Sequence, residues 1–241
     1  MNTFFLISLI VSSLQLSAAA YSTNSNSNDK KNVCFSRDAF LRKTIIATTA
    51  SIFTASATTP SALAFDNRLD DKYSDRTPQT GSQPTNIGVK SRSSRSYPPT
   101  DYDGLAPCDT RPNCWCSSTP FKDAPARYIR SWDPPKSSSA IKEVKKIIDT
   151  YEVGQGGIDG GGYKVISEEE GYLYVQFQSY KSGYIDDVEF WYNSNKVDIR
   201  SASRLGQSDL GVNGKRLEYI GRRLEKEYQW NLNRRKNGSL V

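Results

Sequence analysis

The clearest hydrophobic pattern in the chain is helical and follows Ser137–Ser139, a serine run that offers an N-cap. Apolar residues recur there at spacings of three and four, and lysines fall on the opposite side. The pattern predicts an amphipathic helix of about four turns. Its apolar stripe consists of Ile141, Val144, Ile147, Ile148 and Tyr151.

Alternating apolar and polar positions follow a glycine-rich run at 154–162. They predict strands at 163–167, 172–178 and 188–192 and a last strand around 197–199. The connections are short, which favours an antiparallel meander. The glycine-rich run follows a helix and lacks the Gly-Lys-Ser/Thr ending of a phosphate-binding loop, so we interpret it as a connector.

A second amphipathic helix is predicted after the strands, with Asn213 as its N-cap. Leu217, Ile220, Leu224 and Tyr228 form its apolar stripe, and charges of both signs occupy the other side. We therefore expect an α+β domain over 105–232, in which an antiparallel meander sheet of three to four strands carries two flanking helices. A basic tail, 233–241, follows.

The segment before this domain has a different composition. Residues 65–104 are rich in Asp, Ser, Thr, Arg and Pro and show no apolar periodicity, which predicts a disordered tether. Residues 1–20 are apolar and end in small residues, as a secretory signal peptide does. Residues 21–64 contain a basic stretch and a second apolar run that ends in Ala-Leu-Ala, again a cleavage pattern. The alternative is that 45–64 anchors the chain in a membrane.

Two targeting signals in series resemble the presequences of thylakoid-lumen proteins in algae with secondary plastids, such as diatoms. Those presequences have an aromatic residue after the signal peptide, usually Phe, and Tyr21 stands there. The stretch 36–42 is similar to a twin-arginine export motif in which Asp38 replaces the second arginine, which leaves the export route open. The resemblance implies a plastid thylakoid lumen location with a mature N-terminus at Phe65. Secretion or membrane anchoring, with Tyr21 retained, is the alternative.

The composition excludes several kinds of site. The 241 residues include no histidine, which rules out a Ser-His-Asp triad, a Cys-His pair and any zinc or haem site with a histidine ligand. The net charge of +6 comes from 32 basic and 26 acidic residues, a mixed surface that gives no sign of a nucleic-acid partner. We expect no cofactor.

Four cysteines are present, of which Cys34 lies in the presequence. An oxidising lumen favours a disulfide between Cys108 and Cys114, which would close a small loop. Cys116 then stays free or competes with Cys114 for the same partner.

Polar residues gather at the end of the predicted sheet and the start of the second helix. Arg200 and Arg204 would clamp an anion there, or the acids would hold a hard cation such as Ca²⁺. The structural alternative, which we favour, is that the charges pair with one another and only join the hairpin to the helix. The cluster comprises Asp186, Asp187, Glu189, Asp198, Arg200, Ser201, Ser203, Arg204, Asp209, Asn213 and Arg216.

Several stretches together resemble the domain-of-unknown-function 1499 (DUF1499) family, which includes plastid lumenal proteins. Trp115 and Cys116 depart from the family pattern, which usually has an apolar residue and a serine there. The resemblance implies fold and location rather than activity. The matching stretches are 105–108, 112–118, 182–190, 199–206, 208–213 and 215–216.

These observations favour a non-catalytic lumenal protein that docks on thylakoid membrane complexes, for example as an accessory or assembly partner of a photosystem. After processing it would have no transmembrane segment. The alternative is a small-ligand or metal-binding module, or an enzyme, that uses Asp186, Asp187, Arg200 and Arg204. The sequence contains no catalytic set that we recognise.

Overall fold

A computed structural model defines the fold of the chain from Phe65 onward. The two predicted targeting segments, 1–20 and 21–64, lie outside the residues that it describes, and all described residues belong to the unit Ser56–Val241. The structure describes residues 65–70, 76–93, 99–119, 125–136 and 139–240.

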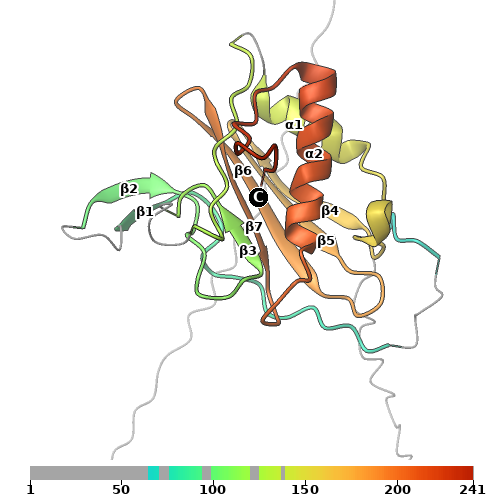
Figure 1. Cartoon of the computed structure of the whole chain (residues 1–241). Helices are drawn as coiled ribbons and strands as arrows, with labels where there is room; N and C mark the ends of the chain where they lie inside the picture. The colour runs from blue at the N-terminus through green and yellow to red at the C-terminus, as the bar shows by residue number, and fades with distance from the viewer. Residues whose placement is uncertain (1–64, 71–75, 94–98, 120–124, 137–138, 241) are drawn as a thin grey trace, which may run out of the picture. The chain divides into compact units, whose positions relative to one another are not determined.

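The central sheet has five antiparallel strands in the order β3-β7-β6-β5-β4 (Figure 1). The last four in sequence form the predicted meander, which confirms the α+β class. The sheet has more strands than the three to four that we expected. The sequence did not reveal β3, because its three residues are too few to show alternation and because it pairs with the distant β7. The strands are β3 (Cys114–Cys116), β4 (Tyr163–Glu169), β5 (Tyr172–Gln178), β6 (Ile185–Asn193) and β7 (Lys196–Ser203).

Two helices, α1 (Ala140–Asp149) and α2 (Val212–Tyr228), pack side by side on one face of the sheet (Figure 1). A 3₁₀ turn, η1 (Gln155–Gly157), lies between α1 and β4. The apolar stripes predicted for both helices pack against the inward residues of the strands, although Tyr228 is only partly buried and Tyr151 follows the end of α1. The fully buried core includes Val144, Ile147, Ile148, Leu173, Val175, Phe177, Val188, Phe190, Val197, Ile199, Leu217, Ile220 and Leu224.

The start of α2 differs from the prediction. The helix begins at Val212, after Gly211 in the left-handed conformation at φ 77°, so Asn213 is not the N-cap but lies buried in the first turn. The Asp209 carboxylate accepts hydrogen bonds from the backbone N–H groups of Gly211 (3.1 Å) and Asn213 (2.7 Å). The Asp209 carboxylate therefore satisfies two backbone amides at this helix end, and the Asn213 side chain is available for contacts inside the domain.

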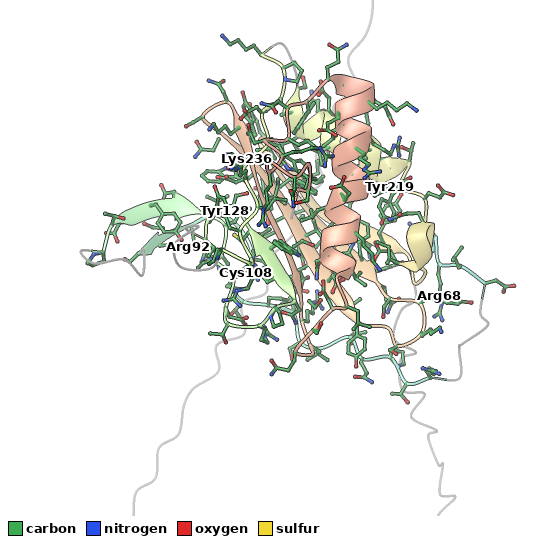
Figure 2. The ribbon with its side chains drawn as sticks, viewed as in Figure 1. Arg68, Arg92, Cys108, Tyr128, Tyr219 and Lys236 are labelled. Carbon is green, nitrogen blue, oxygen red and sulfur yellow. A yellow bond between two sulfur atoms is a disulfide. The ribbon has the colours of Figure 1, made fainter. Side chains whose placement is uncertain are left out.

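The segment 65–70 packs beside β4 although we predicted it to be part of a disordered tether. The Asn67 side chain pairs with the backbone of Tyr163 through two hydrogen bonds, of 3.1 and 2.8 Å. Gly162, at φ 90°, permits this approach, since a Cβ there would stand 2.2 Å from Asn67 Oδ1. Figure 2 places Arg68 on the β4 side of the domain and Cys108 on the β3 side.

Residues 76–88, here called the strap, cross the face of the sheet opposite the helices. The Gln79 N–H donates to the Ser182 carbonyl (2.7 Å), and the Gly88 N–H donates to Glu189 (2.7 Å). A separate two-stranded sheet follows, in which β1 (Lys90–Ser93) pairs with β2 (Asp101–Gly104). The described part of 65–104 is thus ordered by polar, long-range contacts, which a search for apolar periodicity does not detect.

The C-terminal segment is not a free basic tail. Arg234 forms ion pairs with Glu225 (2.7 Å) and Glu218 (2.9 Å), and Leu240 is buried next to Gly221. The domain therefore extends beyond the predicted end at residue 232 to residue 240. Within the described ranges, no helix combines the length and the apolar character needed to cross a membrane.

Candidate functional site

The predicted polar cluster is divided by the sheet. Neighbouring residues on a strand point to opposite faces, so Asp186 faces the helices whereas Asp187 and Glu189 face the strap. The contacts agree: Asp186 accepts from Arg216 of α2 at 2.6 Å, and Asp187 accepts from Arg204 at 2.8 Å. The sequence thus predicted one polar site, and the structure contains two networks on opposite faces.

The inner network centres on Arg216, which is fully buried. Its guanidinium pairs with Asp159 (2.8 Å from Nε) and Asp186, and its carbon Cζ stands 4.6 Å from the centre of the Phe177 ring. Burial alone would lower the pKa of Arg216, but the two carboxylates raise it above its usual value. Burial raises the pKa of Asp186, and Arg216 opposes that change.

Asp159 is a member of this network that the sequence analysis missed. It lies in the glycine-rich connector at φ 55° and also accepts a hydrogen bond from the Tyr151 hydroxyl (2.6 Å). Asp159 is a single acid in the glycine-rich run that we interpreted as a connector, so nothing in the sequence indicated that it is buried. Burial, followed by the charge of Asp159, raises the pKa of Tyr151.

Ser201, Ser203, Asp209 and Asn213 join β7 to α2. The Asn213 amide donates to Ser203 Oγ (3.0 Å) and to the Asp209 carboxylate (2.9 Å), and its oxygen accepts from Ser201. Arg216 Nη1 also donates to the Asn213 oxygen (2.9 Å). On this face the polar residues satisfy one another, which is what the structural interpretation of the cluster expected.

The outer network lies between the sheet and the strap. Arg204 donates to both oxygens of Asp187 at 2.8 Å and to Gln83 of the strap at 2.8 Å. Glu189 pairs with its cross-strand neighbour Arg200 at the longer distance of 3.3 Å. Glu189 also accepts from the strap at Gly88, so the strap is held by both halves of this network.

Asp198 belongs to neither network. It pairs across the ladder with Trp191 and accepts a hydrogen bond from the Ser131 hydroxyl. Burial raises the pKa of Asp198, and the bond from Ser131 lowers it. The structure therefore separates Asp198 from the rest of the predicted cluster.

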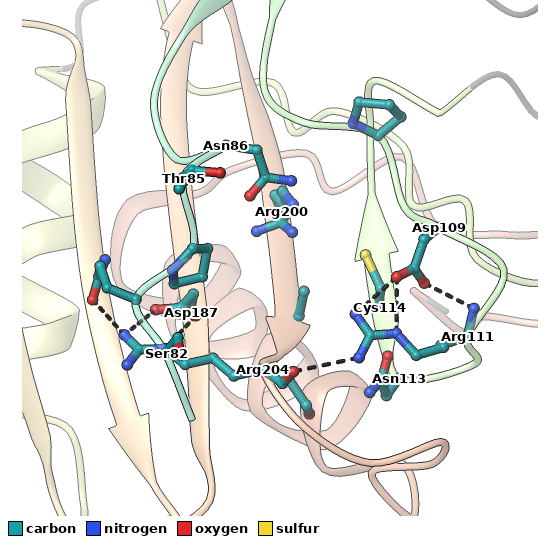
Figure 3. A pocket seen from close by; sticks show the side chains of 15 residues that line it. Ser82, Thr85, Asn86, Asp109, Arg111, Asn113, Cys114, Asp187, Arg200 and Arg204 are labelled. Atoms are coloured by element: carbon teal, nitrogen blue, oxygen red, sulfur yellow. Dashed lines mark hydrogen bonds and ion pairs between the residues drawn. The ribbon is translucent and has the colours of Figure 1, made fainter. Parts of the chain in front are cut away.

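A pocket of about 330 Å³ opens between the outer face of the sheet, the strap and the cysteine loop (Figure 3). Arg111, Arg200 and Arg204 contribute three guanidinium groups to its lining, and Asp109 and Asp187 contribute two carboxylates. Arg111 and Asp109 were not predicted, because they lie in the cysteine loop, far in sequence from β7. The remaining lining residues are Ser82, Gln83, Pro84, Thr85, Asn86, Pro107, Asn113, Cys114, Ala202 and Ser203.

The charged groups of the pocket differ in how fully they are paired. Arg204 and Asp187 satisfy each other, and Arg111 forms an ion pair with Asp109 (2.8 Å). The side chain of Arg200 is only 9% exposed, and its Nε has no hydrogen-bond partner among the described residues. The same holds for Oδ1 of the buried Asn113, whose Nδ2 donates to the Gly206 carbonyl at 2.8 Å.

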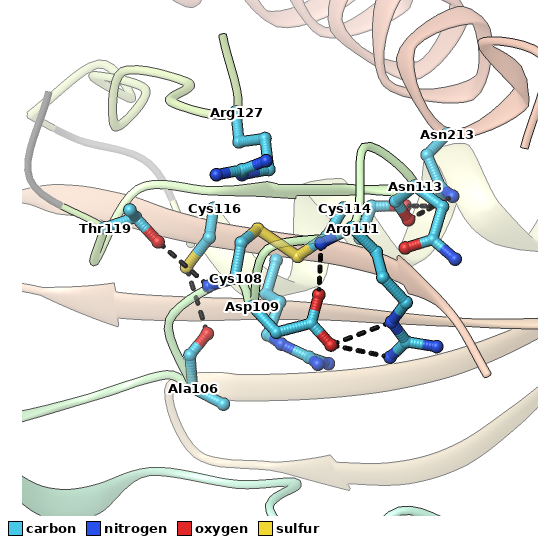
Figure 4. The surroundings of a disulfide bond; sticks show 12 residues. Ala106, Cys108, Asp109, Arg111, Asn113, Cys114, Cys116, Thr119, Arg127 and Asn213 are labelled. Carbon is cyan, nitrogen blue, oxygen red and sulfur yellow. Dashed lines mark hydrogen bonds and ion pairs between the residues drawn. A yellow bond between two sulfur atoms is a disulfide. The ribbon is translucent and has the colours of Figure 1, made fainter. Parts of the chain in front are cut away.

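The cysteine loop contains the expected disulfide. Cys108 and Cys114 are joined with an S–S distance of 2.07 Å and a Cα–Cα distance of 5.7 Å (Figure 4). Cys116 is free and buried, with its Sγ 3.2 Å from the Ala106 carbonyl oxygen. Burial raises the pKa of the Cys116 thiol. Among the described residues, no group of three or more Cys, Asp and Glu side chains is placed to hold a metal ion.

Comparison with known proteins gives a family but no characterised relative. No curated protein and no solved structure matches the chain. The profile of the family described as "Protein of unknown function (DUF1499)" matches residues 104–224, from the end of β2 almost to the end of α2. The match covers half of the chain and includes the charged residues of both networks and the cysteine loop, but not the strap. The chain therefore belongs to the DUF1499 family.

Proposed function

We propose that this domain is a non-catalytic binding module that receives a small polar molecule in the pocket between the sheet and the strap. The observation that carries the proposal is Arg200, a buried guanidinium that lines the pocket with a donor left unpaired. Leaving a buried donor unpaired costs about 1–3 kcal/mol, more when the group is charged. A ligand that accepts this hydrogen bond recovers that cost on binding.

The pairing of the other charged groups favours binding over catalysis. General acid–base chemistry needs a group that is free to exchange a proton with a substrate. Asp187 is held by Arg204 and Asp109 by Arg111, so each acid that lines the pocket already has a charged partner. Burial alone would raise the pKa of Asp109, but the hydrogen bonds from Arg111 and its charge lower it below its usual value.

A fragment screen by two-dimensional NMR on the purified protein tests the proposal. The fragments include acids, bases and neutral compounds at millimolar concentration. Binding in the pocket is expected to shift the backbone amide signals of Ser82, Asn86 and Ala202 and to leave those of Lys142 on α1 unchanged. If no fragment of any class shifts the pocket signals, the domain is not a binding module of this kind.

We also propose that the protein works in the thylakoid lumen of a secondary plastid, of the kind found in diatoms. The double targeting signal supports this location, and the Cys108–Cys114 disulfide is typical of an oxidising compartment. Sequencing of the N-terminus of protein purified from its native source tests the location. A mature chain that begins at Phe65 would support it, and one that begins at Tyr21 would exclude it.

Docking on a thylakoid membrane complex, such as a photosystem, is the second candidate function. One feature favours it: Leu210 is 85% exposed and Leu205 40% exposed, both in the loop between β7 and α2. A partner surface that covered these two side chains would remove their apolar area from water. Co-sedimentation of the protein with detergent-solubilised thylakoid complexes should be lost in Leu210→Ser and retained in Ile166→Ser, a matched change on β4. Recovery of all the wild-type protein in the soluble fraction would refute docking.

A further inference from the structure

We propose that the pocket ligand is a small carboxylate that carries a neighbouring hydrogen-bond donor, as a 2-hydroxy acid does. This inference rests on the proposed binding function and names the chemical class of the ligand. Two polar atoms on the pocket residues are buried and lack partners among the described residues, the donor Arg200 Nε and the acceptor Asn113 Oδ1. A ligand that satisfies both must accept one hydrogen bond and donate another.

Arg200 is the one of the three pocket arginines that has a buried donor without a partner among the described residues. Arg204 donates through Nε and Nη2 to Asp187, and Arg111 donates through Nε and Nη2 to Asp109. Among the described contacts, the Arg200 guanidinium makes a single hydrogen bond, from Nη1 to Glu189 at 3.3 Å, which is longer than the usual range for a charged pair. Figure 3 shows Arg200 among the lining side chains with no interaction drawn to its neighbours there.

The shape of a guanidinium favours a carboxylate as its partner. Two adjacent N–H groups on one edge of an arginine match the two oxygens of a carboxylate, which gives a bidentate pair. Phosphate sites usually add a helix N-terminus or a run of backbone amides. At the N-terminus of α2 the amides of Gly211 and Asn213 already bind Asp209. A singly charged carboxylate is also repelled less than a doubly charged phosphate by Asp109 and Asp187.

The second unpaired atom, Asn113 Oδ1, narrows the chemical class of the ligand further. Asn113 Nδ2 donates to the Gly206 carbonyl, which fixes the side-chain oxygen as the atom without a partner. A hydroxyl or amino group next to the carboxylate would supply the missing donor. The volume of about 330 Å³ lies at the small end of the range for ligand pockets, which suits a small molecule.

Titration of the purified protein with four probes, followed by NMR, tests the inference. The probes are glycolate, acetate, glycolamide and inorganic phosphate. We expect glycolate to bind most tightly, acetate more weakly because it lacks the hydroxyl, and neutral glycolamide at least about tenfold more weakly than glycolate, since it loses a charged hydrogen bond. Tighter binding of phosphate or glycolamide than of glycolate would overturn the carboxylate assignment. Equal affinities for acetate and glycolate would show that the hydroxyl donor of the ligand does not contribute to binding.

Two variants place the interaction on Arg200. Arg200→Lys keeps a positive charge beside Glu189 but loses the planar fork, and it should weaken glycolate binding about tenfold. Arg111→Lys, a matched change in a more exposed arginine of the same pocket, should change it less than threefold. Equal effects of the two variants would refute the role of Arg200. If Arg200→Lys does not fold, the order of the affinities of the wild-type protein for the four probes still decides whether the ligand is a carboxylate with a neighbouring donor.

The two proposals can fail separately. If only basic or neutral fragments of the screen bind in the pocket, the carboxylate inference is wrong and the binding function stands. If no fragment binds there at all, both are wrong.

Discussion

Replacement of Arg216 by methionine should remove about 4 kcal/mol of stability. The substitution keeps most of the apolar volume of the side chain but leaves Asp159 and Asp186 facing each other without a cation, at 1% and 10% side-chain exposure. The fold then tolerates them best if one becomes protonated. Protonating a carboxyl of ordinary pKa near 3.9 at pH 7 costs about 4 kcal/mol, at 1.36 kcal/mol per pH unit. The usual cost of breaking a buried ion pair, about 3–5 kcal/mol, agrees.

The stability lost in Arg216→Met should be smaller at low pH than at neutral pH. In Arg216→Met, the carboxyl that becomes protonated has a higher pKa in the folded state than in the unfolded state. Its protonation therefore favours the folded state fully below the unfolded-state pKa, and this stabilisation is lost as pH rises through the folded-state pKa. The loss relative to the wild type should shrink to about 1.5 kcal/mol at pH 5. The triple variant Arg216→Met, Asp159→Asn, Asp186→Asn has no buried charge left to neutralise and should recover much of the stability.

Urea denaturation followed by tryptophan fluorescence at pH 7 and pH 5 measures these differences, since Trp132 and Trp230 are buried in the core. A loss below about 1 kcal/mol for the single variant would contradict the magnitude. A triple variant no more stable than the single variant would show that packing of the arginine, and not its charge, is what the core requires.

Three further predictions concern the loops. Reduction of Cys108–Cys114 should cost about 2–3 kcal/mol and should raise hydrogen exchange around the cysteine loop but not in β5 or α2, because the bond closes a short loop; global unfolding would contradict this. Cys116 should resist alkylation in the native protein and react after unfolding, since it is buried and burial raises its pKa; rapid native labelling would refute it. Gly162→Ala should destabilise the domain by about 1–3 kcal/mol and expose the chain near Asn67 to protease, because φ is 90° and the new Cβ meets Asn67; an unchanged cleavage pattern would argue against the contact.

The sequence predicted those elements whose residues bury a regular face. Alternation over 172–178 and 188–192, with short connections, was enough for the meander, and the stripe from Leu217 to Leu224 was enough for α2. The sequence could also have predicted that Asp186 and Asp187 face opposite sides of the sheet. Asp186 has the same parity along β6 as the core residues Val188 and Phe190, so it had to point toward the helices.

The rest of the candidate site depends on contacts between distant segments that carry no periodic signal. Asp159 meets Arg216 only because the glycine-rich connector folds back under α2, and Gln83 meets Arg204 only because the strap crosses the sheet. A polar side chain in a connector looks the same in sequence whether it faces water or a buried arginine, since its burial is decided by the chain that covers it. The sequence pattern was therefore enough for the four-stranded meander and its two helices. The fifth strand, the pairing of the charges and the unpaired donor of Arg200 depend on contacts between segments that are distant in sequence.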